Sequence, residues 1–147
     1  VMEVKQIDAK DTLNIRQKIL RPDGKTEDCQ FPADNDELSF HLGAYIDDKL
    51  VSVASFYMDN HPTIEAEYQF RLRGMATLDD NRGQGMSSAL LRTAFPLITK
   101  NHVNTLWCNA RISAVGFYQK VGFEPIGEEF DIEGIGPHVL MLKKLES

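Results

Sequence analysis

The stretch from Leu72 to Ser88 constrains this chain more than any other part of it. It reads LRGMATLDDNRGQGMSS, a strand-like run that ends in a glycine-punctuated turn and leads directly into a helical pattern of apolar residues. Gly83 and Gly85 allow a tight turn and a close approach of the backbone to a ligand. The free N–H groups and the positive dipole end at a helix start attract anions, and Arg82 adds a full charge there. The segment therefore predicts a binding site for a phosphate chain.

The composition predicts one globular domain spanning residues 1–147. Hydrophobic residues make up 42% and charged residues 26% of the chain, and no apolar span is long enough to cross a membrane. The net charge of -6 argues against a nucleic-acid or membrane-surface partner, so an anionic ligand would need locally concentrated arginines. Cys29 and Cys108 lack the spacing of metal ligands, and we expect no metal. The N-terminal residues do not resemble a signal peptide, which predicts a cytoplasmic protein.

Apolar periodicity predicts the order of the strands and helices. We expect strands at residues 2–8, 40–46, 50–57, 68–78, 105–110, 123–131 and 137–144. A first helix capped by Asp11 or Thr12 should extend to Leu20, before a polar loop at 22–36. A second helix should begin at residue 86, and Pro96 should kink it or end its regular hydrogen bonding early. The predicted class is α/β, with a mixed, mostly antiparallel sheet, a central parallel strand–helix–strand unit and helices on both faces.

Two motifs resemble those of the GNAT superfamily of acyl-CoA-dependent N-acetyltransferases. The first is Arg82-Gly83-Gln84-Gly85-Met86-Ser87, which is similar to the family's pyrophosphate signature R-x-x-G-x-G/A except for Ser87 at the last position. The second runs from Ser113 to Phe123 and resembles the family's short helix that carries a tyrosine and closes on Gly-Phe. The sequence contains neither a P-loop nor a dinucleotide-binding fingerprint. The resemblance implies a GNAT fold with acetyl-CoA as cosubstrate.

The resemblance also implies roles for individual residues. In the superfamily, the strands that match residues 72–78 and 105–110 splay apart and admit the pantetheine arm. The implied contacts with acetyl-CoA are Met75, Ala76, Thr77, Arg82, Gly83, Gln84, Gly85, Met86, Ser87 and Ser88. Asn109, at the end of its predicted strand, is a further candidate for contact with the cofactor or with a water molecule, the alternative being that it caps a turn. The backbone N–H of Met75 is the implied oxyanion donor, because a fixed dipole aimed at developing charge lowers a barrier. Tyr118 is the implied acid that protonates the departing thiolate.

A narrower resemblance, spread over nearly the whole chain, is to the glyphosate N-acetyltransferase branch. It rests on the segments Met2-Glu3-Val4-Lys5, Ile19-Leu20-Arg21-Pro22, His41-Leu42-Gly43, Leu72 to Leu78, Leu106 to Arg111 and Gly136-Pro137-His138. It implies a small anionic amine as substrate, held by Arg21, Arg73 and Arg111, with His138 as the base. Guanidinium groups offer paired donors that match carboxylate or phosphonate oxygens. A neutral imidazole can accept a proton from an ammonium group near pH 7.

Two other functions remain open at the level of sequence. A GNAT enzyme that acetylates a peptide or protein amine would carry these arginines as ordinary surface residues. A non-catalytic acyl-CoA-binding sensor would keep the phosphate site and lose turnover. The leading hypothesis is direct acetyl transfer to a small anionic amine, with His138 as base and Tyr118 as acid.

Overall fold

The computed structural model describes residues 1–146 and contains seven strands and three α-helices. The strands are β1 (Met2–Ile7), β2 (Phe40–Ile46), β3 (Lys49–Met58), β4 (Phe70–Thr77), β5 (Thr105–Arg111), β6 (Glu124–Ile132) and β7 (Gly136–Lys144). The helices are α1 (Ala9–Ile15), α2 (Met86–Thr99) and α3 (Val115–Lys120). Short helical turns are η1 (Arg16–Leu20, a π-helix) and the 3₁₀ turns η2 (Thr26–Cys29), η3 (Asp79–Asn81) and η4 (Ile112–Ala114). All the predicted strands, the two helices predicted from periodicity and the short tyrosine-bearing helix implied by the resemblance are present.

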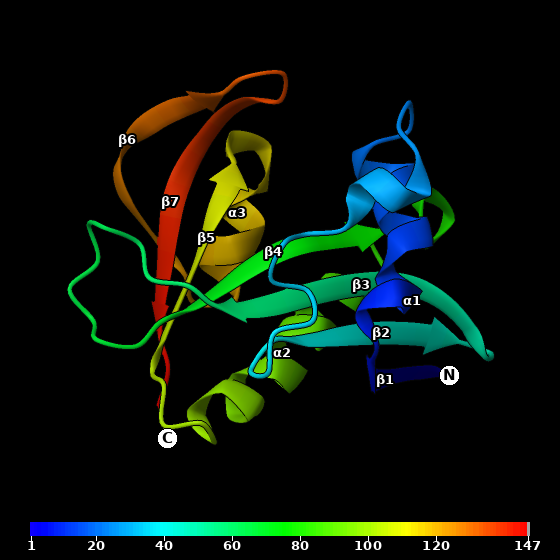
Figure 1. The fold of residues 1–147 in the computed structure, drawn as a ribbon, viewed down its shortest axis with the longest axis horizontal. Coiled ribbons are helices and arrows are strands. Elements are labelled where there is room, and N and C mark those ends of the chain that lie inside the picture. The colour runs from blue at the N-terminus through cyan, green and yellow to red at the C-terminus, as the bar shows by residue number, and fades with distance from the viewer. Residues whose placement is uncertain (147) are drawn as a thin grey trace.

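The seven strands form one sheet in the order β1-β2-β3-β4-β5-β7-β6 (Figure 1). Every neighbouring pair is antiparallel except β4 and β5, which are parallel and connected through α2. This arrangement confirms the predicted mixed sheet with one central parallel unit. No helix within residues 1–146 has both the length and the apolar character needed to cross a lipid bilayer.

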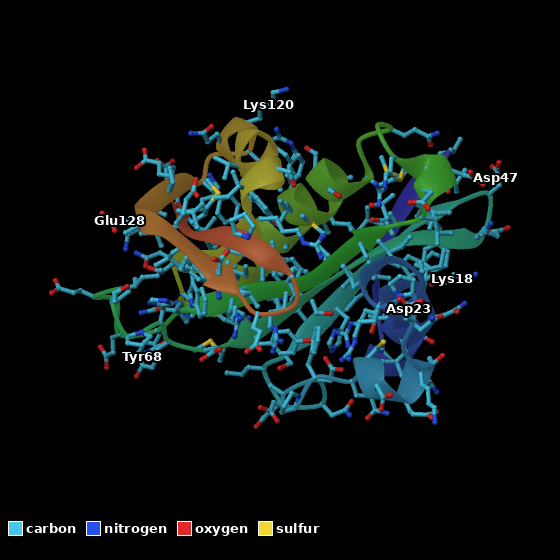
Figure 2. The ribbon with its side chains drawn as sticks, turned by 90° about the horizontal axis from the view of Figure 1, so that it is seen from above. Lys18, Asp23, Asp47, Tyr68, Lys120 and Glu128 are labelled. Atoms are coloured by element: carbon cyan, nitrogen blue, oxygen red, sulfur yellow. The ribbon has the colours of Figure 1, made fainter. Side chains whose placement is uncertain are left out.

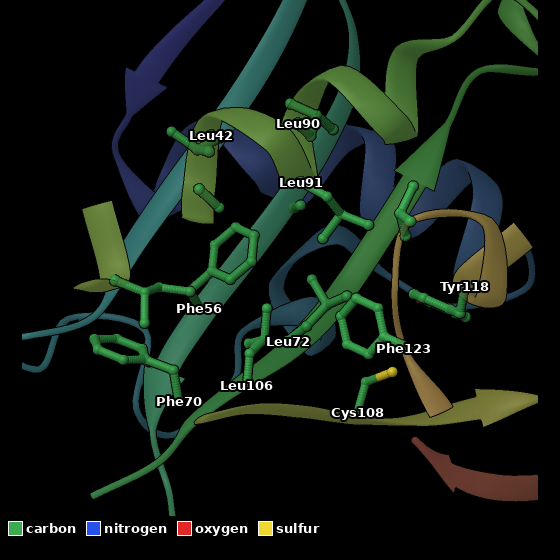
Figure 3. Packing of buried hydrophobic residues seen from close by; sticks show 14 of the residues in the cluster. Leu42, Phe56, Phe70, Leu72, Leu90, Leu91, Leu106, Cys108, Tyr118 and Phe123 are labelled. Carbon is green, nitrogen blue, oxygen red and sulfur yellow. The ribbon is translucent and has the colours of Figure 1, made fainter. Parts of the chain in front are cut away.

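The helices cover both faces of the sheet because side chains alternate along each strand. Val53 of β3 packs with Ile15 on the face covered by α1, whereas the next residue, Ala54, joins the main core on the opposite face. That core contains the apolar stripe of α2, including the fully buried Leu90 and Leu91 (Figure 3). Full burial of one leucine side chain contributes about 1.5–3 kcal/mol, so this stripe fixes α2 on the sheet.

The predicted start of the first helix is wrong, and of the two alternatives predicted at Pro96 an early helix end is excluded. The first helix begins at Ala9, because Asp8 is the cap: its backbone N–H donates to the Asp11 carboxylate (3.1 Å) from a position before the helix. Thr12 is instead buried within the helix, and its hydroxyl donates to the Ala9 carbonyl (2.6 Å). The second helix does not end early at Pro96 but continues to Thr99, since the Lys100 N–H still donates to the Pro96 carbonyl (3.0 Å). The predicted loop at 22–36 also contains the turn η2.

The parallel pairing of β4 with β5 is short. Only Phe70 with Leu106 and Arg71 with Trp107 are in register, whereas β5 pairs with β7 from Thr105 to Arg111. Beyond these two pairs the strands diverge, with β4 continuing toward α1 and β5 toward α3 (Figure 1). The sheet is therefore split along its middle, and the split is where the candidate site lies.

Candidate active site

A cavity of about 820 Å³ occupies the split between β4 and β5. Its walls come from these two strands, the start of α2, α3, η1 and the β6–β7 hairpin. The structure brings together here all the predicted site residues except Gln84: Arg21, Arg73, Met75, Ala76, Thr77, Arg82, Gly83, Gly85, Met86, Ser87, Ser88, Asn109, Arg111, Tyr118 and His138. The Gln84 side chain is exposed and donates to the Asp80 carbonyl (3.5 Å) instead of reaching the cavity.

A β-bulge on β4 shapes the middle of the cavity. Arg73 pairs with Ser55 and Ala76 with Val53, so that Gly74 and Met75 together oppose a single residue of β3. Gly74 has a φ of +63°, which glycine adopts without strain. A bulge leaves one residue outside the regular ladder and re-aims its backbone and side chain. Met75, the predicted oxyanion donor, is therefore at the point where β4 departs from regular pairing.

The start of α2 forms one end of the cavity. Gly83 (φ +75°) and Gly85 (φ +82°) make the turn, and Gly85 is the N-cap residue of the helix. A Cβ added at either glycine would have no neighbour within 4 Å, so the turn presents open backbone. The first helical bond is donated by Ala89 to the Gly85 carbonyl (3.0 Å), and the N–H groups before it have no carbonyl partner within the helix. These groups and the helix dipole can bind an anion.

Arg82 adds a positive charge next to this turn. Its guanidinium pairs with the Asp79 carboxylate at 3.2 Å, and both side chains are exposed. An exposed pair of this kind contributes little stability, so Arg82 can exchange Asp79 for a phosphate at small cost. The first turn of α2 contains no acidic residue that would oppose an anion.

The buried pair of Tyr118 and Cys108 lies on the face of the sheet that packs against α2 and α3 (Figure 3). Burial raises the pKa of Tyr118 well above its usual value, and the neighbouring Cys108 adds to the shift. Burial likewise raises the pKa of the Cys108 thiol to about 12. Near neutral pH the phenol therefore keeps its proton. The thiol also stays protonated, which makes it a poor nucleophile.

His138 lies on β7 at the other side of the cavity and is 4% exposed. Its Nδ1 is 2.8 Å from the Gly136 carbonyl oxygen. Because a carbonyl oxygen can only accept, this hydrogen bond assigns the ring proton to Nδ1. The neutral ring then has its lone pair at Nε2, which is the arrangement that a general base requires.

Three cavity arginines have no carboxylate partner in the part of the chain that the structure describes. The ion pairs of residues 1–146 do not include Arg21, Arg73 or Arg111. Arg73 is half-buried, and its pKa is lowered first by burial and then by the charge of Arg71. Many other charged side chains project from the periphery, as Lys120 and Glu128 do in Figure 2. The cavity thus concentrates positive charge on a chain whose net charge is -6.

Asn109 contributes an unpaired polar atom to the same cavity. Its Oδ1 is buried and has no hydrogen-bond partner among the described residues. A buried acceptor without a partner costs free energy, which a ligand N–H group at this position would recover. The amide N–H groups of a pantetheine arm are donors of this kind.

A buried ion pair that the sequence did not predict lies next to the cavity residue Phe31. The Arg16 guanidinium, 1% exposed, donates to both carboxylate oxygens of Asp34, at 2.8 and 3.0 Å. It also donates to the Ser55 and Tyr57 hydroxyls, at 2.8 and 3.0 Å. Phe31, which lines the cavity, was missed as well. The only signals in the sequence were a cation inside an apolar helix pattern and an aromatic residue in a polar loop.

No group of three or more His, Cys, Asp or Glu side chains within residues 1–146 is placed to hold a metal ion. The candidate functional elements of the cavity are the turn from Arg82 to Ser88, the Tyr118 phenol, the His138 imidazole and the three arginines.

Comparisons with known proteins identify the family. The family model described as "Acetyltransferase (GNAT) domain" matches residues 21–145. The chain is 43% identical over 147 residues to the Bacillus subtilis (strain 168) protein named "Uncharacterized N-acetyltransferase YitI", covering all of this chain and 99% of that protein.

Solved structures show the same fold at lower identity. An aminoglycoside 6'-N-acetyltransferase complexed with coenzyme A superposes with a TM-score of 0.77 at 14% identity, covering 99% of this chain and 98% of the other. Escherichia coli ElaA superposes with a TM-score of 0.73 at 17% identity, covering 98% and 100%. The family model and the full-length relative establish that this chain belongs to the GNAT family of acetyl-CoA-dependent N-acetyltransferases.

Proposed function

We propose that this enzyme transfers the acetyl group of acetyl-CoA to the amine of a small anionic substrate, an amino acid or an aminophosphonate of the glyphosate type. The observation that carries the proposal is the set of three cavity arginines without carboxylate partners in residues 1–146. Unpaired guanidinium groups facing a cavity favour a ligand that supplies the missing negative charge. A peptide amine with no acidic group would leave them unpaired.

Acetyl-CoA binds, in this proposal, along the split between β4 and β5. The backbone from Arg82 to Ser88 receives the diphosphate, because it combines free helix N–H groups with a cation. The pantetheine arm extends past Thr77, Ala76 and Met75 on β4, and Asn109 on β5 accepts a hydrogen bond from it. The thioester then lies near the bulge of β4.

The acceptor, in this proposal, binds at the part of the cavity that is lined by the three arginines and His138. Arg73, Arg111 and Arg21 bind its carboxylate or phosphonate through paired N–H donors. His138, which lies opposite Arg111 in the β5–β7 register, is then close to the amine of the bound substrate. Nε2 takes the proton that the amine loses, because Nδ1 already carries the hydrogen bonded to Gly136.

The transfer is direct. The amine nitrogen forms a bond to the thioester carbonyl carbon while the Met75 N–H stabilises the oxyanion, and the C–S bond then breaks. Tyr118 donates its proton to the departing thiolate, and His138 holds the proton taken from the amine. An acyl-enzyme on Cys108 is disfavoured, because the raised pKa keeps that thiol protonated.

A product screen tests this proposal. The purified chain is incubated with acetyl-CoA and a panel of neutral amino acids, acidic amino acids, aminophosphonates including glyphosate, and peptides, and the products are identified by mass spectrometry. We expect acetylation of the anionic amines in preference to the neutral ones. Preferential acetylation of peptides would contradict the proposal, and coenzyme A binding without any acetylated product would indicate a sensor.

A further inference from the structure

The Phe31 ring contacts two guanidinium groups. The Cζ atom of Arg16 is 4.2 Å from the ring centroid, and that of Arg73 is 4.1 Å from it. Arg16 is buried and neutralised by Asp34, whereas Arg73 lines the cavity and lacks a carboxylate partner among the described residues. The ring therefore contacts both a buried arginine of the protein interior and one of the arginines of the proposed acceptor site.

We infer that Phe31 is a positioning residue of the acceptor site, which holds the Arg73 guanidinium in the orientation that receives the substrate anion. This inference rests on the proposed function. It adds to that function a residue from a loop that precedes β2, far in sequence from β4 and β5.

Hydrogen bonds to buried side chains hold the loop that carries Phe31 in place. The Phe31 N–H donates to Asp34 Oδ2 (2.9 Å), and the Asp34 N–H donates to the Phe31 carbonyl (3.0 Å). Arg16 donates to the Cys29 carbonyl (3.0 Å) in addition to its pair with Asp34. The Tyr57 hydroxyl donates to Asp34, and the Tyr57 ring meets Phe31 edge-on, with centroids 6.2 Å apart. These contacts fix the ring before any substrate binds.

The bulge of β4 makes room for the ring. A Cβ on Gly74 would be 2.9 Å from Phe31 Cε2 and 3.2 Å from Arg16 Nε, closer than real Cβ atoms normally approach. A glycine directly after Arg73 therefore allows Phe31 to lie against the strand. Gly74 also has the positive φ of the bulge, so this glycine allows both the bulge geometry and the contact with Phe31.

The charges around Arg73 affect how strongly its guanidinium is held in one orientation. Burial lowers the pKa of Arg73 most, the charges of Arg71 and Arg16 lower it further, and Tyr57 and Asp59 raise it. Arg71 therefore repels the Arg73 guanidinium more than Arg16 does, and Tyr57 and Asp59 partly offset this repulsion. The face of an aromatic ring carries partial negative charge and attracts a cation. Without the ring, Arg73 would gain rotamer freedom, and substrate binding would have to offset the loss of that freedom.

The test is a double-mutant cycle in the full chain, with the best anionic acceptor found in the product screen. We expect Phe31→Leu to raise the KM of the acceptor about 2- to 30-fold, the range for losing one cation–π contact, and to change the KM of acetyl-CoA by less than about twofold. Because Phe31 acts through Arg73, adding Phe31→Leu to Arg73→Ala should change the acceptor KM by less than about twofold. Tyr68→Leu, at an aromatic residue that is 57% exposed, is the matched control and should leave both KM values unchanged.

The double-mutant cycle distinguishes failure of the positioning role of Phe31 from failure of the anion site. Equal effects of Phe31→Leu in the presence and absence of Arg73 would overturn the inference, because Phe31 would then act independently of Arg73. If Arg73→Ala itself leaves the acceptor KM unchanged, the anion site of the proposed function fails, and the positioning role fails with it.

A second variant covers the case in which Phe31→Leu does not fold. Replacing Phe31 with 3,4,5-trifluorophenylalanine preserves the ring shape and weakens the negative charge of its face. We expect the acceptor KM to rise by part of the Phe31→Leu effect at an unchanged melting temperature. An unchanged KM would overturn the inference.

Discussion

Arg111 of β5 and His138 of β7 are directly opposite each other in the antiparallel ladder. Opposite residues of such a pair point to the same face, with Cβ atoms about 4.5–5.5 Å apart. A guanidinium that can bind an anion is therefore next to an imidazole whose Nε2 can accept a proton. In the proposed reaction this pair aligns the substrate, because the acid group on Arg111 brings the amine to His138.

Replacing His138 should separate catalysis from cofactor binding. We expect His138→Ala to lower kcat about 10²- to 10⁴-fold, the usual contribution of a general base, with little change in the KM of acetyl-CoA. His102→Asn is the control, since His102 is exposed and has a positive φ that asparagine tolerates. Steady-state kinetics at several pH values provide the measurement. A His138→Ala enzyme with wild-type kcat at every pH would remove His138 from the mechanism.

Tyr118→Phe tests the proposed acid without disturbing the packing. The ring contacts Phe117 and Phe123, each with centroids 5.2 Å apart, and the variant keeps both contacts. We expect kcat to fall and the melting temperature to change little. Since the pKa of Tyr118 is raised above about 10, the wild-type enzyme should show no alkaline loss of activity from this group below pH 10. Unchanged kcat in Tyr118→Phe would show that another donor protonates the thiolate.

The cavity arginines should govern acceptor affinity. We expect Arg73→Ala or Arg111→Ala to raise the KM of the anionic acceptor about 10- to 150-fold, the effect of losing a hydrogen bond to a charged group. The KM of acetyl-CoA should stay constant. Arg111→Lys should recover only part of the affinity, because a lysine is a point charge without the paired donors. Normal acceptor KM values in both alanine variants would exclude an anion site here.

Ser87→Asp probes the start of α2. A carboxylate in the first helical turn favours the helix dipole by about 0.3–1 kcal/mol, so the free protein should be as stable as the wild type or slightly more so. The same charge should repel a diphosphate and weaken coenzyme A binding in a calorimetric titration. Thr99→Asp introduces an equal charge at the far end of α2 and is the control. Equal affinities in the two variants would place the diphosphate elsewhere.

Asp34→Asn should destabilise the fold. It leaves the buried Arg16 without its carboxylate, and breaking a buried pair costs about 3–5 kcal/mol. Burial by itself raises the pKa of Asp34, but hydrogen bonds from Arg16, the Tyr57 hydroxyl and the Phe31 N–H outweigh it, and the pKa is lowered. A lowered pKa contributes stability above the unfolded value of about 3.9 that is lost as the pH falls below it.

Thermal melts between pH 2 and pH 7 check this prediction. The wild-type melting temperature should fall steeply below about pH 4, and Asp34→Asn should be less stable at pH 7 with a shallower acid decline. The two curves should approach each other at low pH. Parallel curves over the whole range would show that Asp34 does not contribute to the acid sensitivity.

The sequence predicted the strands, the helices α1 and α2 apart from the start of α1, and the turn from Arg82 to Ser88, because these features depend on neighbouring residues. Glycines before an amphipathic helix and alternating apolar residues are local signals. The family comparison confirms the GNAT resemblance that rested on this turn. The narrower glyphosate resemblance and the roles of His138 and Tyr118 stay predictions.

Long-range contacts could not be predicted in the same way. Arg16 and Asp34 are 18 residues apart, and each has the appearance of an ordinary surface charge in the sequence. Their burial depends on η1 and the following loop folding together against β3. Phe31 is in a polar loop without periodicity, so no pattern indicated its contact with Arg73. The bulge at Gly74 arises from the strand register, which the sequence of β4 alone does not specify.

The short pairing of β4 with β5 leaves a cavity that is lined from both faces of the sheet, by Ile19 and Leu20 after α1 and by Phe117 and Tyr118 of α3. If the thioester and the amine arrive from opposite sides, neither has to depart before the other enters. Initial-rate plots at varied concentrations of both reactants should then intersect rather than run parallel, the signature of a ternary complex.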